Sequence, residues 1–337
     1  MTIKTLSTSP SVAKRAPVTV ITTCYGRNRH LYNLLSSLMN SRIQPAEVII
    51  VNDDADPKRL AEYDLNIVQI ATTADAVVNE SSVGSNNTDF DIGHNRNLGA
   101  ARASHDMLIF LDVDCIVAPT FIEQLKMKLQ TQPNGLFMGQ PRYLTRPLSE
   151  VEALQLRDGT LSVSYLNRLS VYNPYRDNFD KNEPCATKEQ TTATKQTATK
   201  KTEDYGAFWS LCFAINRPYF EQIGGFDTQY TGYGAEDTDF AFTARQLNMD
   251  FYLTADVVYH QQHAVYRPPI NHLDSIIINA NRFYDKWQCW PMEGWLSQFA
   301  KMGLISWKVD QIIPIVLIRR PSCHEMASAH CPDAPYV

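Results

Sequence analysis

The chain has 337 residues, long enough to bury a large hydrophobic core without disulfide bonds. Its 31 Lys and Arg residues and 36 Asp and Glu residues give a formal net charge of −5, without the basic excess that is typical of nucleic-acid-binding proteins. The 14 glycines and the hydrophobic fraction of 44% exclude collagen-like and wholly disordered chains, so the sequence predicts a folded, soluble protein without a nucleic-acid partner.

The cysteines and the N-terminal residues indicate a cytoplasmic protein. The seven cysteines are an odd number, and residues 1–15 are rich in Ser, Thr and Lys without the apolar stretch of a secretory signal. No apolar run reaches the ~20 residues of a membrane span. The run at residues 312–318, followed by Arg319 and Arg320, is expected to pack in the core, with peripheral contact to a membrane surface as the alternative.

Expected strands and helices alternate in the first third of the chain. A polar leader at residues 1–16 precedes a β-branched run at 17–23 that is typical of a strand. The next expected elements are a helix at 29–39, a strand at 48–51, a possible strand at 65–70, a helix at 93–103 and a strand at 107–111. This alternation predicts an α/β fold with a Rossmann-like, mainly parallel sheet covered by helices on both faces.

The second half of the chain contains a segment of low complexity. Residues 182–203 repeat Ala-Thr-Lys and contain almost no bulky apolar side chain, so we expect a flexible loop there. This loop is expected to lie between two parts of one catalytic unit, residues 17–120 and 204–265. Residues 266–337 are expected to form a helical C-terminal extension.

Acidic side chains follow two of the expected strands. Asp53 comes after the strand at 48–51, and Asp112 and Asp114 come after the strand at 107–111. Side chains alternate along a strand with a period of two, so Asp112 and Asp114 are expected to point the same way, toward one ligand. Carboxylate oxygens suit Mg²⁺ or Mn²⁺, which proteins often hold together with substrate phosphates. For Asp53 alone, a turn or capping residue is the favoured interpretation.

Two further groups of polar residues fit either a structural or a chemical role. Glu236 and Asp237 lie at the glycine-rich start of a helical stretch, where acids commonly stabilise the helix dipole. A carboxylate that is partly desolvated there can instead act as a general base. His260 and His263 follow the strand-like residues 255–259. Such histidines are usually surface or core residues, and a metal ligand that completes the aspartate site is the alternative.

The motifs together resemble glycosyltransferase family 2 and related enzymes with the GT-A fold. The matching segments occur in the family's order over residues 17–265, and they are 18–23 with the following helix, 48–53, 95–99, 110–114, 224–227 and 232–237. The last segment is also similar to the Gly-Trp-Gly-x-Glu-Asp region of β-1,4-galactosyltransferases and chondroitin-polymerase-type enzymes, with Tyr233 in place of Trp. Asn95 stands where the family usually has Ala. The resemblance makes the N-terminal part the nucleotide-binding half and the later part the acceptor half.

The resemblance implies a UDP-sugar donor. Thr22 or Thr23 would line the nucleoside pocket, and Asp53 would lie near the uracil or ribose. Arg96 matches the family's Ala-Arg-Asn-x-Gly element, which implies that it helps to position the donor. Tyr233 would stack on a sugar ring.

The resemblance also implies an inverting, metal-dependent reaction. Asp114 would bind Mn²⁺ or Mg²⁺ directly, and Asp112 would lie near the ribose and the metal. His260 is the better match to the family's late metal-binding histidine, and His263 is the second choice. The cation would offset negative charge on the leaving diphosphate. Asp237, the family's expected base, would remove the proton from the acceptor hydroxyl.

The expected acceptor is a glycan, or a precursor in polysaccharide biosynthesis. One alternative is a sugar nucleotidyltransferase, although residues 22–27 are too poor in glycine for the phosphate-binding loop that such an enzyme needs. Another is a sugar-nucleotide- or carbohydrate-binding protein of the same fold without turnover. The sequence has neither a dinucleotide fingerprint nor a Walker A motif, which disfavours NAD chemistry and P-loop ATP hydrolysis.

Overall fold

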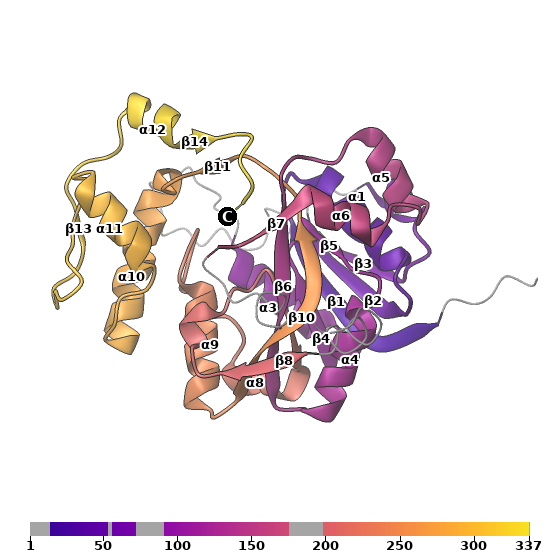
Figure 1. Ribbon diagram of the computed structural model, residues 1–337. Helices are drawn as coiled ribbons and strands as arrows, with labels where there is room; N and C mark the ends of the chain where they lie inside the picture. The colour runs from indigo at the N-terminus through magenta and orange to yellow at the C-terminus, as the bar shows by residue number, and fades with distance from the viewer. Residues whose placement is uncertain (1–13, 53–55, 72–90, 175–197, 337) are drawn as a thin grey trace, which may run out of the picture.

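The computed structural model describes residues 14–52, 56–71, 91–174 and 198–336 (Figure 1). Its centre is a ten-stranded sheet. The strands are β1 (Arg15–Cys24), β2 (Gln44–Asn52), β3 (Ile67–Ile70), β4 (Met107–Leu111), β5 (Cys115–Val117), β6 (Gly135–Leu144), β7 (Ser170–Tyr172), β8 (Thr199–Thr202), β9 (Cys212–Asn216) and β10 (Asp250–His260). They lie in the order β3-β2-β1-β4-β9-β6-β10-β5, while β7 pairs with β6 and β8 pairs with β10.

Most strands of the sheet run in one direction. β1 is parallel to β2 and β4, β2 is parallel to β3, and β6 is parallel to β10. β9 is antiparallel to both β4 and β6, so those two strands also share a direction. Six of the ten strands, β1, β2, β3, β4, β6 and β10, therefore point the same way. The expected α/β fold with a mainly parallel sheet is confirmed.

Helices cover both faces of the sheet. They are α1 (Asn28–Met39), α2 (Pro57–Leu60), α3 (Ile92–Arg102), α4 (Phe121–Thr131), α5 (Glu150–Arg157), α6 (Val163–Leu169), α8 (Arg217–Ile223) and α9 (Glu236–Gln246), with a 3-10 turn η1 (Tyr205–Ala207). Val18 and Val20 of β1 pack in one hydrophobic cluster with residues of α1 and α4. Ile21 packs in a second cluster with residues of α3, α8 and α9. Burial on both faces explains why the run at 17–23 is β-branched rather than alternating with polar residues.

The first strand begins earlier than the sequence predicts. Arg15 pairs with Gln44 of β2, so β1 starts inside the leader predicted at residues 1–16. Residues 1–13 lie outside the described part of the chain.

The segment predicted as a flexible loop at 182–203 ends in a strand. β8 pairs in antiparallel fashion with β10, and Lys201 Nζ lies 2.6 Å from Asp250 Oδ1 of that strand. Strand pairing uses backbone groups, which a polar sequence supplies as well as an apolar one. Residues 182–197 lie outside the described part of the chain.

The C-terminal extension contains helices and pairs of short strands. Its elements are β11 (Val265–Tyr266), η2 (Ile270–His272), α10 (Leu273–Trp287), α11 (Glu293–Lys301), β12 (Ile305–Ser306), β13 (Val316–Leu317), α12 (Cys323–Ala329) and β14 (His330–Cys331). These elements share a hydrophobic cluster of their own. Figure 1 shows α10 next to α9, where Trp287 contacts Phe242 with ring centroids 5.4 Å apart. Within the described residues, the longest apolar helices are too short to cross a membrane.

The apolar run at residues 312–318 is divided between core and surface. Ile315 is buried in the hydrophobic cluster of the extension. The side chains of the run that face solvent are Ile312, Ile313, Val316 and Ile318. The expectation that this run packs in the core is therefore wrong for most of its length. β12 and β13 pair over only two residues each, so the chain between them extends beyond the sheet contacts that would bury it.

Serine substitutions are expected to distinguish the two environments of this run. Ile312 is 81% exposed, so Ile312→Ser should change the free energy of unfolding by less than about 0.5 kcal/mol. Ile315 is 4% exposed, and Ile315→Ser should lower that free energy by roughly 2–5 kcal/mol because it empties a core position. Urea unfolding of the two variants checks the difference, and equal losses would contradict it.

Candidate active site

The candidate site lies at the carboxyl ends of β1, β4 and β10. Asp112 and Asp114 are in the turn between β4 and β5, which is closed by a hydrogen bond from Cys115 N to Asp112 O at 3.0 Å. A turn does not keep the strand period of two, and the two carboxylates have different hydrogen-bond partners. Asp112 Oδ1 accepts a hydrogen bond from Arg96 Nη2 at 2.7 Å, whereas Asp114 Oδ2 accepts one from Arg27 Nη1 at 2.6 Å.

Three side chains at this edge could hold a metal ion. Asp114, His260 and His263 each offer one ligand atom, and these atoms lie within 4.8 Å of one another. His260 Nε2 is 3.3 Å from Asp114 Oδ1, and His263 Nε2 is 3.3 Å from Asp114 Oδ2. The structure thus brings both candidate histidines to Asp114. Asp112, the fourth expected ligand, is not in this group of described residues and pairs with Arg96 instead.

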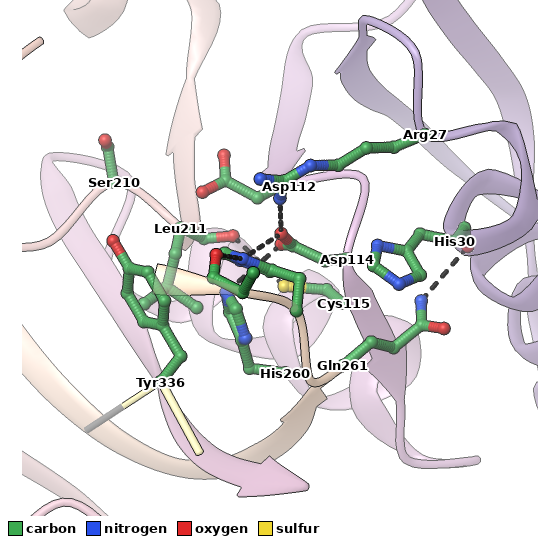
Figure 2. Close-up of polar contacts among 12 residues, drawn as sticks. Arg27, His30, Asp112, Asp114, Cys115, Ser210, Leu211, His260, Gln261 and Tyr336 are labelled. Carbon is green, nitrogen blue, oxygen red and sulfur yellow. Dashed lines mark hydrogen bonds and ion pairs between the residues drawn. The ribbon is translucent and has the colours of Figure 1, made fainter. Parts of the chain in front are cut away.

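The end of β10 positions these ligands. Gln261, directly after His260, donates a backbone hydrogen bond to Asp114 O at 2.7 Å. Its side chain accepts a hydrogen bond from Asn33 Nδ2 at 2.7 Å and donates one to His30 O at 3.1 Å, which ties the strand end to α1. Figure 2 shows Gln261 and His30 on one side of Asp114 and His260 on the other.

The charge states of these side chains suit metal binding. Burial lowers the pKa of His260, although the negative charge of Asp114 opposes this, so the neutral imidazole that binds metals is favoured. Burial alone would raise the pKa of Asp114, but His260, His263 and Arg27 together hold it well below its usual value. Asp114 Oδ1 is buried without a hydrogen-bond partner among the described residues. A carboxylate and two imidazoles therefore fit a divalent cation.

A second group of charged side chains surrounds Arg96 of α3. Its guanidinium is 4% exposed, and Nη2 also donates to Ser210 O at 3.3 Å. The positive charge of Arg96 acts on Asp112 and on both acids at the start of α9. Nη1 is buried and has no hydrogen-bond partner in the described part of the chain. Arg96 therefore has one free donor group among three carboxylates.

The two acids of α9 have raised pKa values. Burial and the charge of Asp237 raise the pKa of Glu236 to about 7, although Arg96 opposes the shift. Burial also raises the pKa of Asp237, and a hydrogen bond from Thr238 N at 2.7 Å opposes it. A carboxylate with a raised pKa is a stronger base than an ordinary one, so this pair can accept a proton near neutral pH.

The backbone before α9 takes conformations that favour glycine. Gly234 has a φ of 101°, and a Cβ atom there would lie 2.7 Å from Met292 Sδ. Ala235, which follows, has a φ of 73° and begins α9 from the left-handed region. Gly234 and Ala235, in the turn before α9, therefore pack against Met292 of the extension.

The sequence profile described as "Glycosyltransferase like family 2" matches residues 19–268. The chain belongs to this family. No curated protein matches the chain.

Solved structures with a similar arrangement are distant in sequence. GalNAc-T7, crystallised with UDP, GalNAc and Mn²⁺, is 15% identical with a TM-score of 0.44, over 72% of this chain and 42% of that chain. TarS residues 1–349 from S. aureus are 12% identical with a TM-score of 0.44, over 79% of this chain and 65% of that chain. A longer S. aureus TarS chain is 12% identical with a TM-score of 0.45, over 79% of this chain and 39% of that chain. The chain thus spans less than two thirds of each of these proteins.

The described residues expected to bind the donor are buried or already contact other side chains. Thr22 and Thr23 are buried in β1, and Thr22 Oγ1 has no hydrogen-bond partner among the described residues. Tyr233 stacks on His272 and Trp295, with ring centroids 4.5 Å and 5.7 Å apart. Neighbouring rings therefore already contact Tyr233 where a sugar was expected to stack. Asp53 lies outside the described residues.

Sequence reasoning missed two residues of the candidate site. Arg27, just before α1, forms the ion pair with Asp114, and no local pattern distinguishes it from the neighbouring Arg29. Tyr336 lies over His260 (Figure 2), with ring centroids 4.6 Å apart, although it follows the predicted catalytic unit in sequence. Only the fold of the extension brings it there.

Proposed function

We propose that this glycosyltransferase moves a sugar, with inversion, from a UDP-sugar to a hydroxyl group of a glycan acceptor in a metal-dependent reaction. The observation that supports this most is the group of Asp114, His260 and His263. A pair of acids with raised pKa values, Glu236 and Asp237, interacts with the charge of Arg96, which also pairs with Asp112. A metal site beside a base matches the two needs of the reaction, which are charge neutralisation on the leaving group and proton removal from the acceptor.

Asp114, His260 and His263 would hold the cation, Mn²⁺ or Mg²⁺. A bound cation supplies positive charge that offsets the charge on a leaving diphosphate. Mg²⁺ prefers oxygen ligands and water, so a site with two imidazoles makes Mn²⁺ the first ion to test.

The protein's own groups would carry the other steps. Asp237 would accept the proton of the acceptor hydroxyl, with Glu236 beside it keeping the local negative charge high. Arg96 would donate from its free Nη1 to the donor, since its other contacts are already fixed. Arg27, whose side chain is 40% exposed, would offer its positive charge to the diphosphate. Tyr233 would contact a sugar only after a change in its aromatic neighbours.

The nucleoside would bind at the carboxyl end of β1. Thr22 is buried there with an unpartnered hydroxyl in the described part, and Thr23 follows it. Asp53 follows β2, which is parallel to β1, so the same edge of the sheet would contain all three residues. Asp112, paired with Arg96, would lie near the ribose.

A donor screen tests the proposed function. The full chain is mixed with single UDP-sugars, with and without Mn²⁺, and the unfolding temperature and UDP release are measured. One UDP-sugar should raise the unfolding temperature and release UDP slowly, in a Mn²⁺-dependent way. A binding protein would show the shift without UDP release, and a nucleotidyltransferase would release pyrophosphate from UTP and a sugar 1-phosphate. No response to any nucleotide sugar would refute the proposal.

Two parts of the proposal concern the surroundings of the enzyme. Cys115, Cys289, Cys323 and Cys331 are free cysteines, which supports a reducing, cytoplasmic compartment. The exposed aliphatic residues near Ile312, followed by Arg319 and Arg320, support peripheral contact with a membrane that carries polysaccharide precursors. Flotation with anionic vesicles compares the wild type with Ile312→Ser. If the wild-type protein does not float with the vesicles, membrane contact is contradicted.

A further inference from the structure

The two candidate metal-binding histidines are held in different ways. His263 Nδ1 donates to Ala264 O at 2.9 Å, which fixes its ring and leaves Nε2 for a metal. His260 Nδ1 is buried and has no hydrogen-bond partner within the described residues. Histidines that bind metals usually donate the second ring nitrogen to a partner, and this bond sets the orientation of the ring. His260 therefore needs another means of orientation.

Aromatic rings pack around the imidazole of His260, whose Nδ1 lacks an orienting hydrogen bond within the described part of the chain. The ring of Tyr336 stacks on the imidazole with a centroid distance of 4.6 Å and an angle of 22° between the planes (Figure 2). Tyr143, which pairs with His260 in the sheet, contacts it at 5.5 Å with the planes tilted by 40°. Tyr143 is fully buried, so it forms a fixed wall, and Tyr336 packs from the direction of the extension. Together they restrict the rotation of the imidazole.

Tyr336 is itself held firmly in place. Its hydroxyl oxygen lies 2.9 Å from that of Tyr233. Three further hydrogen bonds hold the residues just before Tyr336. Gln262 Nε2 donates to Pro332 O at 2.6 Å and to Ala334 O at 3.1 Å, and Arg267 Nη2 donates to Pro335 O. Gln262 lies between the two histidines in sequence. The strand end that supplies the ligands thus also anchors the segment that covers them.

We infer that Tyr336 is a positioning residue of the metal site. Its ring orients His260 toward Asp114 in place of the missing hydrogen bond, and its hydroxyl connects this ligand to Tyr233 in the turn before Glu236 and Asp237. The inference rests on the proposed function, because it requires that Asp114, His260 and His263 bind a divalent cation. It adds a residue from outside the predicted catalytic unit to the metal site.

Mn²⁺ binding to the full chain without any donor tests this role. The free ion is followed by electron paramagnetic resonance during a titration. Tyr336→Ala removes the stacked ring and is expected to weaken Mn²⁺ binding about 10- to 100-fold, the range for groups that orient metal ligands. Tyr336→Phe keeps the ring and should bind Mn²⁺ close to the wild-type value. Tyr233→Phe is the matched control, since it removes the partner hydroxyl without touching the stack on His260.

The outcomes separate this inference from the proposed function. A wild type that binds Mn²⁺, with a folded Tyr336→Ala that binds it equally well, overturns the role of Tyr336 and leaves the metal site intact. A wild type that binds no Mn²⁺ overturns both. If Tyr336→Ala does not fold, Tyr336→Leu fills the volume without a stacking ring. Weak binding by the Leu variant and normal binding by the Phe variant support the inference, and equal binding by these two variants refutes it.

Discussion

Asp237→Asn is expected to abolish glycosyl transfer while it leaves UDP-sugar binding nearly intact. Asparagine keeps the shape of the side chain and the hydrogen bond from Thr238 N, which is 2.7 Å long in the wild type. It cannot accept a proton, and the loss of a general base lowers the rate by roughly 10²- to 10⁴-fold. The turnover rate for transfer and the donor dissociation constant are measured on the same preparation. Normal turnover in this variant would remove Asp237 from the mechanism.

Glu236→Gln is the matched control, because Glu236 lies in the same helical turn and its pKa is raised by the same burial. We expect a smaller loss of transfer from Glu236→Gln than from Asp237→Asn. The reverse order would assign the base to Glu236. Both variants should keep the unfolding temperature of the wild type or raise it. Each replaces a carboxylate in a group with excess negative charge by a neutral amide.

The pH profile of the wild type belongs to the same test. A raised pKa means that a carboxyl group keeps its proton to higher pH, and a base acts only after it has lost that proton. Burial raises the pKa of Glu236 to about 7 and raises that of Asp237 as well. Turnover should therefore already fall on acidification at a pH above the value of about 4 for ordinary carboxyl groups. A flat profile down to pH 5 would contradict a base in this pair.

The fold was readable from the sequence because its central strands are buried on both faces. The runs at 48–51 and 107–111 consist almost entirely of apolar residues, a pattern that a two-sided parallel sheet requires. The run at 312–318 has a similar composition but lies mostly in solvent. Composition alone does not separate these cases. The difference lies in tertiary pairing, since β2 and β4 each pair with neighbours on the sheet and the later run borders a hairpin of two-residue strands.

The candidate site was predicted in part. Asp114, His260 and His263 are close together because β4 and β10 end at the same edge, which the order of strands and motifs already indicated. The partner of Asp112 was not predictable from spacing, because the hydrogen bond that closes the turn rotates its carboxylate toward Arg96. Tyr336 reaches the site only through the path of the extension, and no periodic pattern encodes that path.

Asp114→Asn is expected to remove most of the Mn²⁺ affinity and nearly all of the transfer activity. Asp114 is the one carboxylate of the three-ligand group, and a neutral amide is a weak ligand for a divalent cation. Since ligand-orienting groups already contribute about 10- to 100-fold to metal affinity, loss of the ligand itself should cost at least that much. Mn²⁺ titration followed by electron paramagnetic resonance gives the affinity, and transfer assays with added Mn²⁺ show whether excess ion restores activity.

Asp112→Asn separates metal binding from a general effect of charge in this turn. Asp112 lies two residues away and is more exposed than the buried Asp114, and it pairs with Arg96 and is absent from the three-ligand group among the described residues. Asp112→Asn should therefore keep Mn²⁺ affinity close to the wild-type value while it weakens donor binding, because Arg96 loses the negative charge of its partner. Equal loss of Mn²⁺ affinity in both variants would place Asp112 among the ligands. Retained affinity in Asp114→Asn would refute the metal site, since no other carboxylate of the group could replace it.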